Sequence, residues 1–418
     1  MTDTDVLIIG AGVAGCSLAR LLDDRGLEVT LLEKSGIGGL LREIEFDTGY
    51  YCDSAPHLLF FDEEDQPELR ELFERYTTLR RDEFYAATYP TGGLDDPHHY
   101  PVSEANIDRW EDADQIRAEL RERTDALDAE FFDEFVRSQV GETLYGRYFQ
   151  DYTEKHWGVD PSRITGDWFD FKINFPEDER EFFGDGAYYP KDRYTDILAE
   201  MIAGCELKHD RAARLVTDGG QVKSVVTDNG EELRADVFVS TIVPNALLPE
   251  VVKSPRYRSM VILGAHVQAE ADLFPQHVDW GYFPNHYEFT RITDYEFTRQ
   301  SLTSDEYILT VEFPCFEGDR LWRRPDEWYR SYLFGVLEEH DLAPEVLSWE
   351  VRRAARAYPL PLQEEIEKFR RLDEELTAYE NLETHGRVGN YEYIWMKDIV
   401  EESTQMAPRI ERLLRGTD

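Results

Sequence analysis

The first forty residues contain the feature that most constrains the fold, a glycine motif that follows an apolar run. Residues 6–9 read Val-Leu-Ile-Ile and lead directly into Gly-Ala-Gly-Val-Ala-Gly at residues 10–15, after which a helical pattern begins. This order predicts a buried parallel strand followed by a helix. Gly10 permits the tight turn, Gly12 lets the backbone approach a pyrophosphate, and Gly15 lets the helix pack closely on the strand. The helix N-terminus adds unpaired N–H groups and partial positive charge, so the motif predicts a dinucleotide site.

A carboxylate ends the second predicted strand. Glu33 lies 18 residues after Gly15, at the end of the apolar run 27–32. There it can accept hydrogen bonds from a ribose 2′-hydroxyl, which favours FAD or NAD over NADP. Residues 37–42 (Ile-Gly-Gly-Leu-Leu-Arg) come next and resemble the Gly-Gly segment that many FAD-binding oxidoreductases and mutases place over the pyrophosphate and ribityl chain. The alternative is a Gly-Gly loop without chemical meaning. The resemblance favours FAD, with Gly38, Gly39 and Arg42 among the cofactor-binding residues.

The charge of the chain restricts its partners. The 418 residues include 87 acidic and 45 basic ones, a formal net charge of -42, and only nine of the basic residues are Lys. Acid spread over every segment is typical of a halophilic protein, in which counterions screen the repulsion. The negative field of such a protein opposes the binding of nucleic acid and of anionic membranes, so a phosphate site needs a local cluster of Arg and Lys. Three of the nine lysines fall between residues 155 and 191, which is modest evidence for such a site.

The length predicts two or three domains. The four cysteines have no metal-ligand spacing, which predicts reduced thiols, no metal site and a cytoplasmic location. No stretch approaches about 18 apolar residues, so we expect neither a signal segment nor a membrane span.

The rest of the pattern predicts an α/β fold. Helical spacing covers residues 66–79, 104–149, 194–205, 326–341, 362–378 and 397–414. A meander is predicted over residues 206–242, with its last strand rejoining the parallel sheet, and strands dominate residues 260–313. The predicted organisation is a Rossmann-like FAD-binding domain (1–65, 196–250 and 380–418), a helical domain (66–160) and a mainly antiparallel β-sheet substrate domain (161–195 and 251–379).

Two further segments carry candidate site residues. His57 lies between Pro56 and an apolar run, where a histidine taken alone is more often an interior side chain with satisfied hydrogen bonds. Residues 145–158 are rich in aromatic side chains and include Lys155. They predict either a platform that stacks on a base or a flavin, or an aromatic helix end that anchors a core.

Taken together, these segments resemble UDP-galactopyranose mutases over nearly the whole chain. The resemblance rests, in order, on the glycine unit, Pro-His at 56–57, Tyr-Thr-Glu-Lys-His-Trp-Gly at 152–158, Phe-Thr-Arg-Ile at 289–292, Ala-Tyr-Pro at 357–359 and the Gly-Arg segment at 386–396. The segment 152–158 is the most specific. In that family FAD acts in its reduced form, FADH⁻. Its N5 attacks the anomeric carbon and expels UDP, and the flavin N5–sugar adduct lets the ring reclose with the other size.

The resemblance implies a role for each matching residue. Tyr152 would stack on the base and Trp157 would line the sugar pocket. The diphosphate would be held by Arg291, Tyr358 and Tyr393, together with Lys172. The catalytic set is then His57, Arg291 and Lys172, and the cofactor would also contact Gly386, Arg387 and Met396. The implied partners are a nucleotide sugar and an external reductant such as NAD(P)H or a reductase, in cell-surface glycan synthesis, with a homodimer left open.

Four departures from the family pattern leave the substrate open. Lys172 aligns with a mobile-loop arginine, and Asp192-Arg193 replace a glycine pair. Trp395 replaces an aspartate near the flavin, and the stretch 313–358 is longer than the resemblance implies. A mutase for another nucleotide sugar is one alternative. The others are an FAD-dependent oxidoreductase of the amine oxidase or protoporphyrinogen oxidase type and a non-catalytic FAD-binding partner protein.

Overall fold

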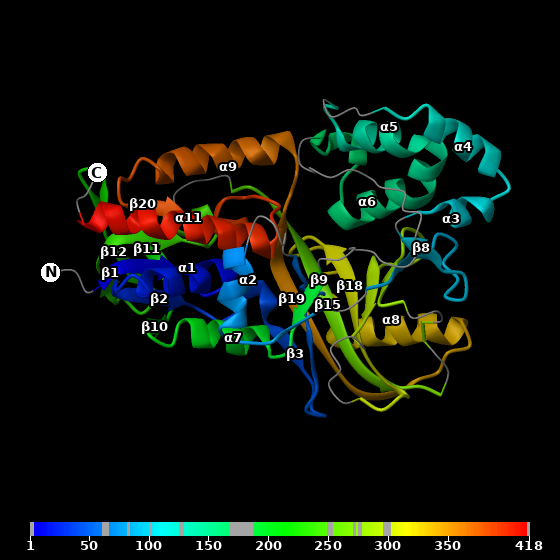
Figure 1. Ribbon diagram of the computed structural model, residues 1–418, viewed down its shortest axis with the longest axis horizontal. Helices are drawn as coiled ribbons and strands as arrows, with labels where there is room; N and C mark the ends of the chain where they lie inside the picture. The colour runs from blue at the N-terminus through cyan, green and yellow to red at the C-terminus, as the bar shows by residue number, and fades with distance from the viewer. Residues whose placement is uncertain are drawn as a thin grey trace.

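A five-stranded parallel sheet forms one half of the molecule (Figure 1). The computed structural model describes residues 4–60, 67–81, 84–100, 102–124, 129–166, 187–248, 254–270, 273–274, 278–295 and 302–415. The strand order is β10-β2-β1-β14-β20, and all neighbours run parallel. The strands are β1 (Thr4–Ile9), β2 (Val29–Glu33), β10 (Glu206–His209), β14 (Ala235–Ser240) and β20 (Leu382–Thr384). The apolar run of β1 is buried, as expected for a strand that is covered on both faces.

Different layers cover the two faces of this sheet. On one face, α1 (Val13–Asp23) packs against α11 (Met396–Arg415) and α7 (Tyr194–Met201). On the other face lies a small antiparallel sheet of β11 (Ala212–Asp218), β12 (Gln221–Thr227) and β13 (Glu232–Leu233). Its apolar side chains share a core cluster with Leu7 and Phe238 of the parallel sheet. The predicted α/β architecture is confirmed.

Two predictions between residues 194 and 242 are wrong in part. The expected meander begins one strand later, because β10 pairs in parallel with β2 instead of joining the antiparallel strands. β10 directly follows α7, and a strand that returns to a sheet through a helix runs parallel to its neighbour. The helix predicted to reach Cys205 ends at Met201, ahead of Gly204. The sequence pattern thus identified these elements but not the partner of the short strand.

The second half of the molecule contains a seven-stranded, mainly antiparallel sheet in the order β19-β15-β18-β17-β16-β7-β8. Its strands are β19 (Glu345–Pro359), β15 (Tyr257–Gln268), β18 (Glu306–Cys315), β17 (Arg291–Asp294), β16 (Trp280–Tyr282), β7 (Ala86–Thr88) and β8 (His98–Tyr100). One face packs on α8 (Asp326–Glu339), and the opposite face shares the largest core cluster with α1 and the parallel sheet. The two sheets are therefore joined by a continuous core.

A helical layer lies beside the antiparallel sheet (Figure 1). It consists of α3 (Glu104–Asp108), α4 (Ala113–Arg121), α5 (Phe132–Leu144), a π-helical turn (Tyr145–Phe149) and α6 (Gln150–Trp157). The other elements are β3 (Glu43–Glu45), β4 (Tyr51–Asp53), β5 (Leu59–Phe60), α2 (Pro67–Glu74), β6 (Leu79–Arg81), β9 (Ala187–Pro190), α9 (Gln363–Leu376) and α10 (Gly386–Gly389). The layer places α6, which carries the segment 152–158, against β18.

Candidate functional site

The glycine loop between β1 and α1 has room for a ligand at one position only. A Cβ on Gly15 would lie 2.0 Å from the carbonyl oxygen of Gly10, so the packing of α1 on β1 itself requires glycine there. A Cβ on Gly12 would meet only the Cα of Gly39, at 3.9 Å. Packing within the protein therefore does not itself require glycine at position 12, and a glycine there fits the close approach of a pyrophosphate.

Glu33 ends β2 with its carboxylate turned toward this loop. Its Oε2 accepts a hydrogen bond from the backbone N–H of Ala11 at 3.0 Å. Its Oε1 accepts from the N–H and hydroxyl of Ser35, at 2.7 and 3.0 Å. These bonds hold the buried carboxylate beside the loop, and a carboxylate retains lone pairs for a ribose hydroxyl.

The Gly-Gly segment packs directly on the glycine loop. Gly38 and Gly39 have φ of 111° and 57°, and the Gly38 N–H donates to the carbonyl of Ala11 at 2.8 Å. A Cβ on Gly39 would lie 3.2 Å from the Cα of Gly12. Arg42 follows on the surface and donates to the carbonyl of Ser35 at 3.2 Å. The predicted cofactor residues of the first forty positions therefore lie together.

The C-terminal Gly-Arg segment meets the same region from the other side. A Cβ on Gly386 (φ 77°) would lie 2.6 Å from the Cβ of Ala14 at the start of α1. Arg387 donates from Nε and Nη2 to the carbonyl of Ile394, at 3.0 and 2.6 Å. Its guanidinium also lies 5.6 and 5.4 Å from the ring centres of Tyr358 and Tyr393. Met396, also predicted here, is half-buried at the first position of α11.

His57 is a neutral side chain within a group of cations. Burial lowers its pKa to about 3, and the charges of Arg387, Arg352 and Arg291 add to this effect. Its Nδ1 lies 3.9 Å from Oδ2 of Asp53, which is too long for a hydrogen bond, and within the described chain Nδ1 has no hydrogen-bond partner. His57 is therefore not an interior histidine with satisfied hydrogen bonds.

The carboxyl group beside His57 is buried as well. Burial raises the pKa of Asp53 well above its usual range, and the nearby charge of Glu43 acts in the same direction. The hydroxyl of Tyr189 donates to Oδ1 of Asp53 at 3.0 Å. The hydroxyl of Tyr194 donates to the carbonyl of His57 at 2.5 Å. Asp53, Tyr189 and Tyr194 are neighbours of the site that the sequence analysis missed.

The predicted substrate residues converge into one aromatic cluster. The ring of Trp157 lies 5.9 Å from that of Tyr358 and 6.0 Å from that of Tyr393, and the two tyrosine rings are 5.7 Å apart. His156 stacks on Tyr152 at 5.6 Å and also contacts Tyr358 at 5.3 Å. Residues from α6, the end of β19 and the segment before α11 thus share one cluster.

Arg291 lies at this cluster but is already paired with a carboxylate. Its Nε and Nη2 donate to Oε1 of Glu312 at 2.8 and 2.6 Å, across the β17–β18 ladder. Burial raises the pKa of Glu312, and Arg291 opposes this shift. Glu312 therefore sets the direction of the guanidinium. A charged residue inside the apolar run 307–313 is the signal that could have identified it.

The remaining residues that the sequence analysis singled out are Lys172, Lys155 and Trp395. Lys172 falls within residues 167–186, which are outside the described part of the chain. Lys155 donates from Nζ to the carbonyls of Phe283, Tyr287 and Phe289, so this lysine caps backbone groups and is not a free anion-binding cation. Trp395 is 46% exposed and meets the ring of Phe60 edge-on at 5.0 Å.

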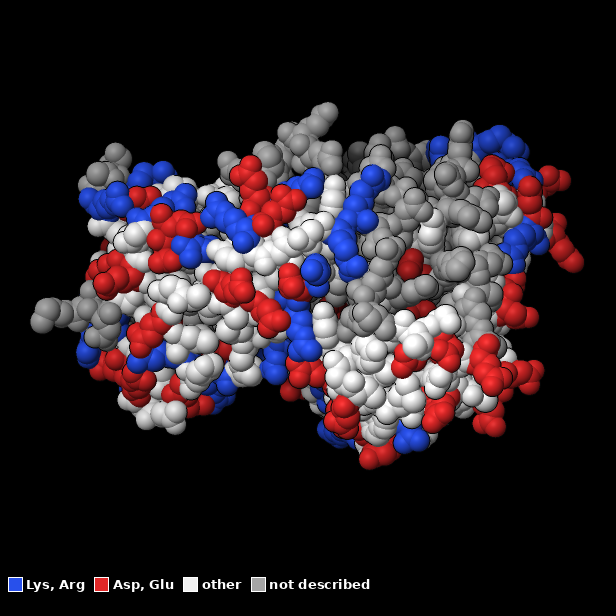
Figure 2. All heavy atoms as spheres, turned by 60° about the horizontal axis from the view of Figure 1, so that its bottom comes forward, with Lys and Arg blue, Asp and Glu red and all other residues white. Residues whose placement is uncertain are grey.

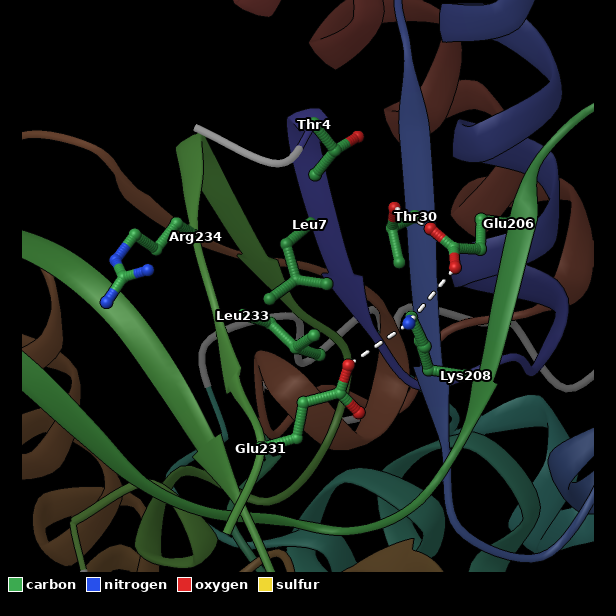
Figure 3. Close-up of a pocket in the computed structure, with 8 residues that line it drawn as sticks. All are labelled: Thr4, Leu7, Thr30, Glu206, Lys208, Glu231, Leu233 and Arg234. Atoms are coloured by element: carbon green, nitrogen blue, oxygen red, sulfur yellow. Dashed lines mark hydrogen bonds and ion pairs between the residues drawn. The ribbon is translucent and has the colours of Figure 1, made fainter. Parts of the chain in front are cut away.

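A separate groove of about 340 Å³ lies beside the first residues of β1, β2 and β10 (Figure 3). Within it, Lys208 pairs with Glu206 and Glu231, at 3.1 Å in each case. Ligands of open α/β sheets bind at the carboxyl ends of the strands, so this groove is not the candidate site.

The charge distribution also favours the region between the two sheets. Acidic side chains lie over both halves of the face shown in Figure 2, and basic side chains gather in a band where the halves meet. Among the described residues, no group of His, Cys, Asp or Glu could hold a metal ion. No described helix is long and apolar enough to cross a membrane.

The fold and the glycine loop define a class of protein. Residues 13–266, more than half of the chain, match the family described as flavin containing amine oxidoreductase. The chain belongs to this family.

Individual relatives and solved structures include sugar mutases. The chain is 26% identical over 208 residues to a dTDP-fucopyranose mutase of Escherichia coli, a match that covers 47% of this chain and 53% of the relative. It is 24% identical over 217 residues to a probable UDP-galactopyranose mutase of Klebsiella pneumoniae, covering 49% and 54%. The chain thus matches about half the length of these curated relatives.

Among solved structures, reduced UDP-galactopyranose mutase superposes with a TM-score of 0.82 at 18% identity, covering 99% of this chain and 94% of the other. A putative protoporphyrinogen oxidase from Exiguobacterium sp. 255-15 superposes with a TM-score of 0.75 at 17% identity, covering 98% and 99%. These superpositions confirm the predicted fold, and together with the curated relatives they confirm the resemblance to the mutases. At such low identity the two superpositions speak for the fold alone.

Proposed function

We propose that this protein is a flavin-dependent nucleotide-sugar mutase that interconverts pyranose and furanose forms, of the UDP-galactopyranose/UDP-galactofuranose type. The observation that carries the proposal is the convergence of Tyr152, Trp157, Tyr358 and Tyr393 in one cluster with the two cations Arg291 and Arg387. Rings can cover a sugar and a base, and arginines can hold a diphosphate leaving group. The mutases among the relatives support the same reading.

FAD fits the glycine loop. The space beside Gly12 and the carboxylate of Glu33 suit the pyrophosphate and the ribose. Gly39 would cover the pyrophosphate, and Arg387 would add charge from the opposite side. When bound and reduced, the flavin supplies a nucleophilic nitrogen for the anomeric carbon of the sugar.

The protein's own groups would bind and orient the nucleotide sugar. Arg291, fixed by Glu312, presents its guanidinium beside the rings of Trp280 and Tyr282. The pair carries no net charge, so the positive field on the diphosphate of the substrate would come mainly from Lys172, while Arg387 would act on the pyrophosphate of FAD. His57, neutral because of its burial, would lie next to the flavin without adding charge.

The deciding experiment separates isomerisation from oxidation. The FAD-loaded protein, in high-salt buffer, is reduced with dithionite and given UDP-galactopyranose and UDP-galactofuranose separately, with dTDP-fucopyranose as a third substrate. If any of the three is interconverted only in the reduced state, the result supports the mutase. The preferred substrate then identifies the class of nucleotide sugar. Absence of interconversion with all three by a reduced, FAD-loaded protein would overturn the proposal.

A flavin oxidoreductase is the second candidate, because the family of the chain is that of amine oxidoreductases and a putative protoporphyrinogen oxidase shares its fold. Its signature would be oxygen uptake with an amine or a porphyrinogen. The cations Arg291, Arg352 and Arg387 around His57 favour an anionic substrate over a cationic amine, so we expect no oxygen uptake with amines.

A further inference from the structure

Two adjacent arginines on β19 point to opposite faces of the antiparallel sheet. Arg352 pairs with Ile262 of β15, and Arg353 pairs with Val261. Ile262 belongs to the core cluster shared with the parallel sheet, whereas Val261 belongs to the cluster beneath α8. Alternation along a strand therefore directs Arg352 toward the dinucleotide loop and Arg353 away from it.

Arg352 binds the Gly-Gly segment from across the sheet boundary. Its Nη2 donates to the carbonyl of Gly39 at 2.6 Å, and its Nη1 donates to the carbonyl of Arg42. Gly39 in turn lies against Gly12 of the glycine loop. The segment is thus held between the loop on one side and the Arg352 guanidinium on the other.

The charge of Arg352 is not neutralised by a close acid. No carboxylate of the described chain forms an ion pair with it, although many of the described arginines pair with an acid. Burial lowers its pKa to about 10, the charge of Arg42 acts in the same direction, and Glu43 opposes them. The Glu43 carboxylate is bound by Thr195. In a protein of net charge -42, a cation without an acid beside the dinucleotide loop points to an anionic ligand.

We propose that Arg352 is a positioning residue for the flavin dinucleotide. It holds the Gly39 and Arg42 carbonyls so that the Gly-Gly segment keeps its place opposite Gly12, and its charge favours the diphosphate of the cofactor. This inference rests on the FAD site of the proposed function but not on the mutase reaction. Nothing in the glycine motifs identifies Arg352, because it comes from the stretch 313–358, which is longer than the resemblance implies.

The test compares Arg352→Ala and Arg352→Lys with Arg353→Ala in the FAD-loaded protein, without any sugar. The measurement is the rate of FAD release at 0.5 and 3 M KCl, followed by the rise in flavin fluorescence. We expect Arg352→Ala to speed release about tenfold or more at 0.5 M KCl, which is the effect of losing one charge-assisted hydrogen bond. Arg352→Lys keeps the charge, so it should release FAD more slowly than Arg352→Ala, and the difference between them should shrink at 3 M KCl.

Arg353→Ala is the matched control. Arg353 donates to the carbonyls of Trp322 and Arg324 and pairs with Asp326 at 2.7 Å, so it supports α8. Its loss should lower the melting temperature of the flavin-free protein and leave FAD release unchanged. Arg352→Ala should instead speed FAD release and leave the melting temperature of the flavin-free protein nearly unchanged. Unchanged release in Arg352→Ala, or a release that rises equally in both variants, overturns the role of Arg352. If the wild type releases FAD slowly yet converts no sugar, only the mutase assignment fails.

Discussion

At the scale of single residues, the Arg291–Glu312 pair most sharply tests the assignment of the substrate site. Charge-assisted bonds at 2.6 and 2.8 Å hold the guanidinium in place. We expect Arg291→Ala to weaken the binding of UDP by about 10- to 100-fold, because a diphosphate loses a charged donor and Glu312 is left without its cation. Isothermal titration with UDP in high salt measures the affinity.

The control for that experiment is Arg353→Ala, which removes an arginine from the other face of the sheet. It should bind UDP as the wild type does. If Arg291→Ala binds UDP as tightly as the wild type, Arg291 is not part of the substrate site.

The neutral state of His57 predicts a pH dependence of stability. Its pKa is depressed in the folded protein, so between its unfolded value and about pH 3 the unfolded chain binds more protons. The free energy of unfolding therefore loses its His57 contribution as the pH falls from about 6.5 toward 3, by at most about 1.4 kcal/mol per pH unit for one group. His57→Gln removes this contribution, so the stability difference between wild type and variant should decrease from pH 7 to pH 4. Urea denaturation across that range measures it.

His209→Gln is a suitable control, because His209 is exposed at the end of β10. Its stability difference from the wild type should stay nearly constant over the same range. A constant difference for His57→Gln as well would show that the folded state does not lower the pKa of His57.

At the scale of elements, two cations hold helix α6 in place. Lys155, which is half-buried, caps three carbonyls of the segment between β16 and β17. Arg258 donates to the carbonyls of Lys155 and His156 at 2.8 and 2.6 Å, at the C-terminal end of the helix. Gly158 closes the helix with φ of 69°, where a Cβ would lie 2.6 Å from Nη1 of Arg258. The residue types of the segment 152–158 are thus needed for packing as well as for the aromatic cluster.

Lys155→Met tests this arrangement. The variant leaves three part-buried carbonyls without their donor, so we expect a loss of about 3 kcal/mol or more in the free energy of unfolding. Lys208→Met is the matched control, because Lys208 pairs with the exposed carboxylates of Glu206 and Glu231 and should change stability by about 0.5 kcal/mol or less. Equal losses in both variants, measured by chemical denaturation, would contradict the capping role of Lys155.

The elements also show what the sequence could and could not predict. The glycine loop, the strand that ends at Glu33 and the Gly-Gly segment follow from local conformation, so the printed sequence was sufficient for them. The partners Glu312 and Arg352 depend on which strands pair, and β-pairing joins residues far apart in the chain without any local motif. The error in predicting the partner of β10 has the same cause, because its four residues do not show whether the strand pairs with β2 or joins the antiparallel meander.

At the scale of the whole molecule, the net charge of -42 should make stability depend on salt. Repulsion among the acidic side chains disfavours the compact state, and the screening length falls from about 10 Å at 0.1 M salt to about 3 Å at 1 M. We expect the melting temperature to rise steadily from 0.1 to 2 M KCl. Sucrose at matched osmolality serves as the control for exclusion effects, and a melting temperature that falls with KCl would contradict the prediction.

The long strand β19 has one more consequence for the whole molecule. It passes the Gly39 carbonyl at Arg352 and reaches the aromatic cluster at Tyr358. The pairing with β15 shifts between these positions, because Arg352 lies opposite Ile262 and Tyr358 lies opposite Arg258, so this part of β19 covers the length of about four strand residues, roughly 13 Å. This one strand fixes the spacing between the two ends of the proposed site. Adding or deleting a residue between Arg352 and Tyr358 would shift one of these two side chains relative to the other. Exchanging side chains along this stretch should therefore disturb the proposed site less than changing its number of residues.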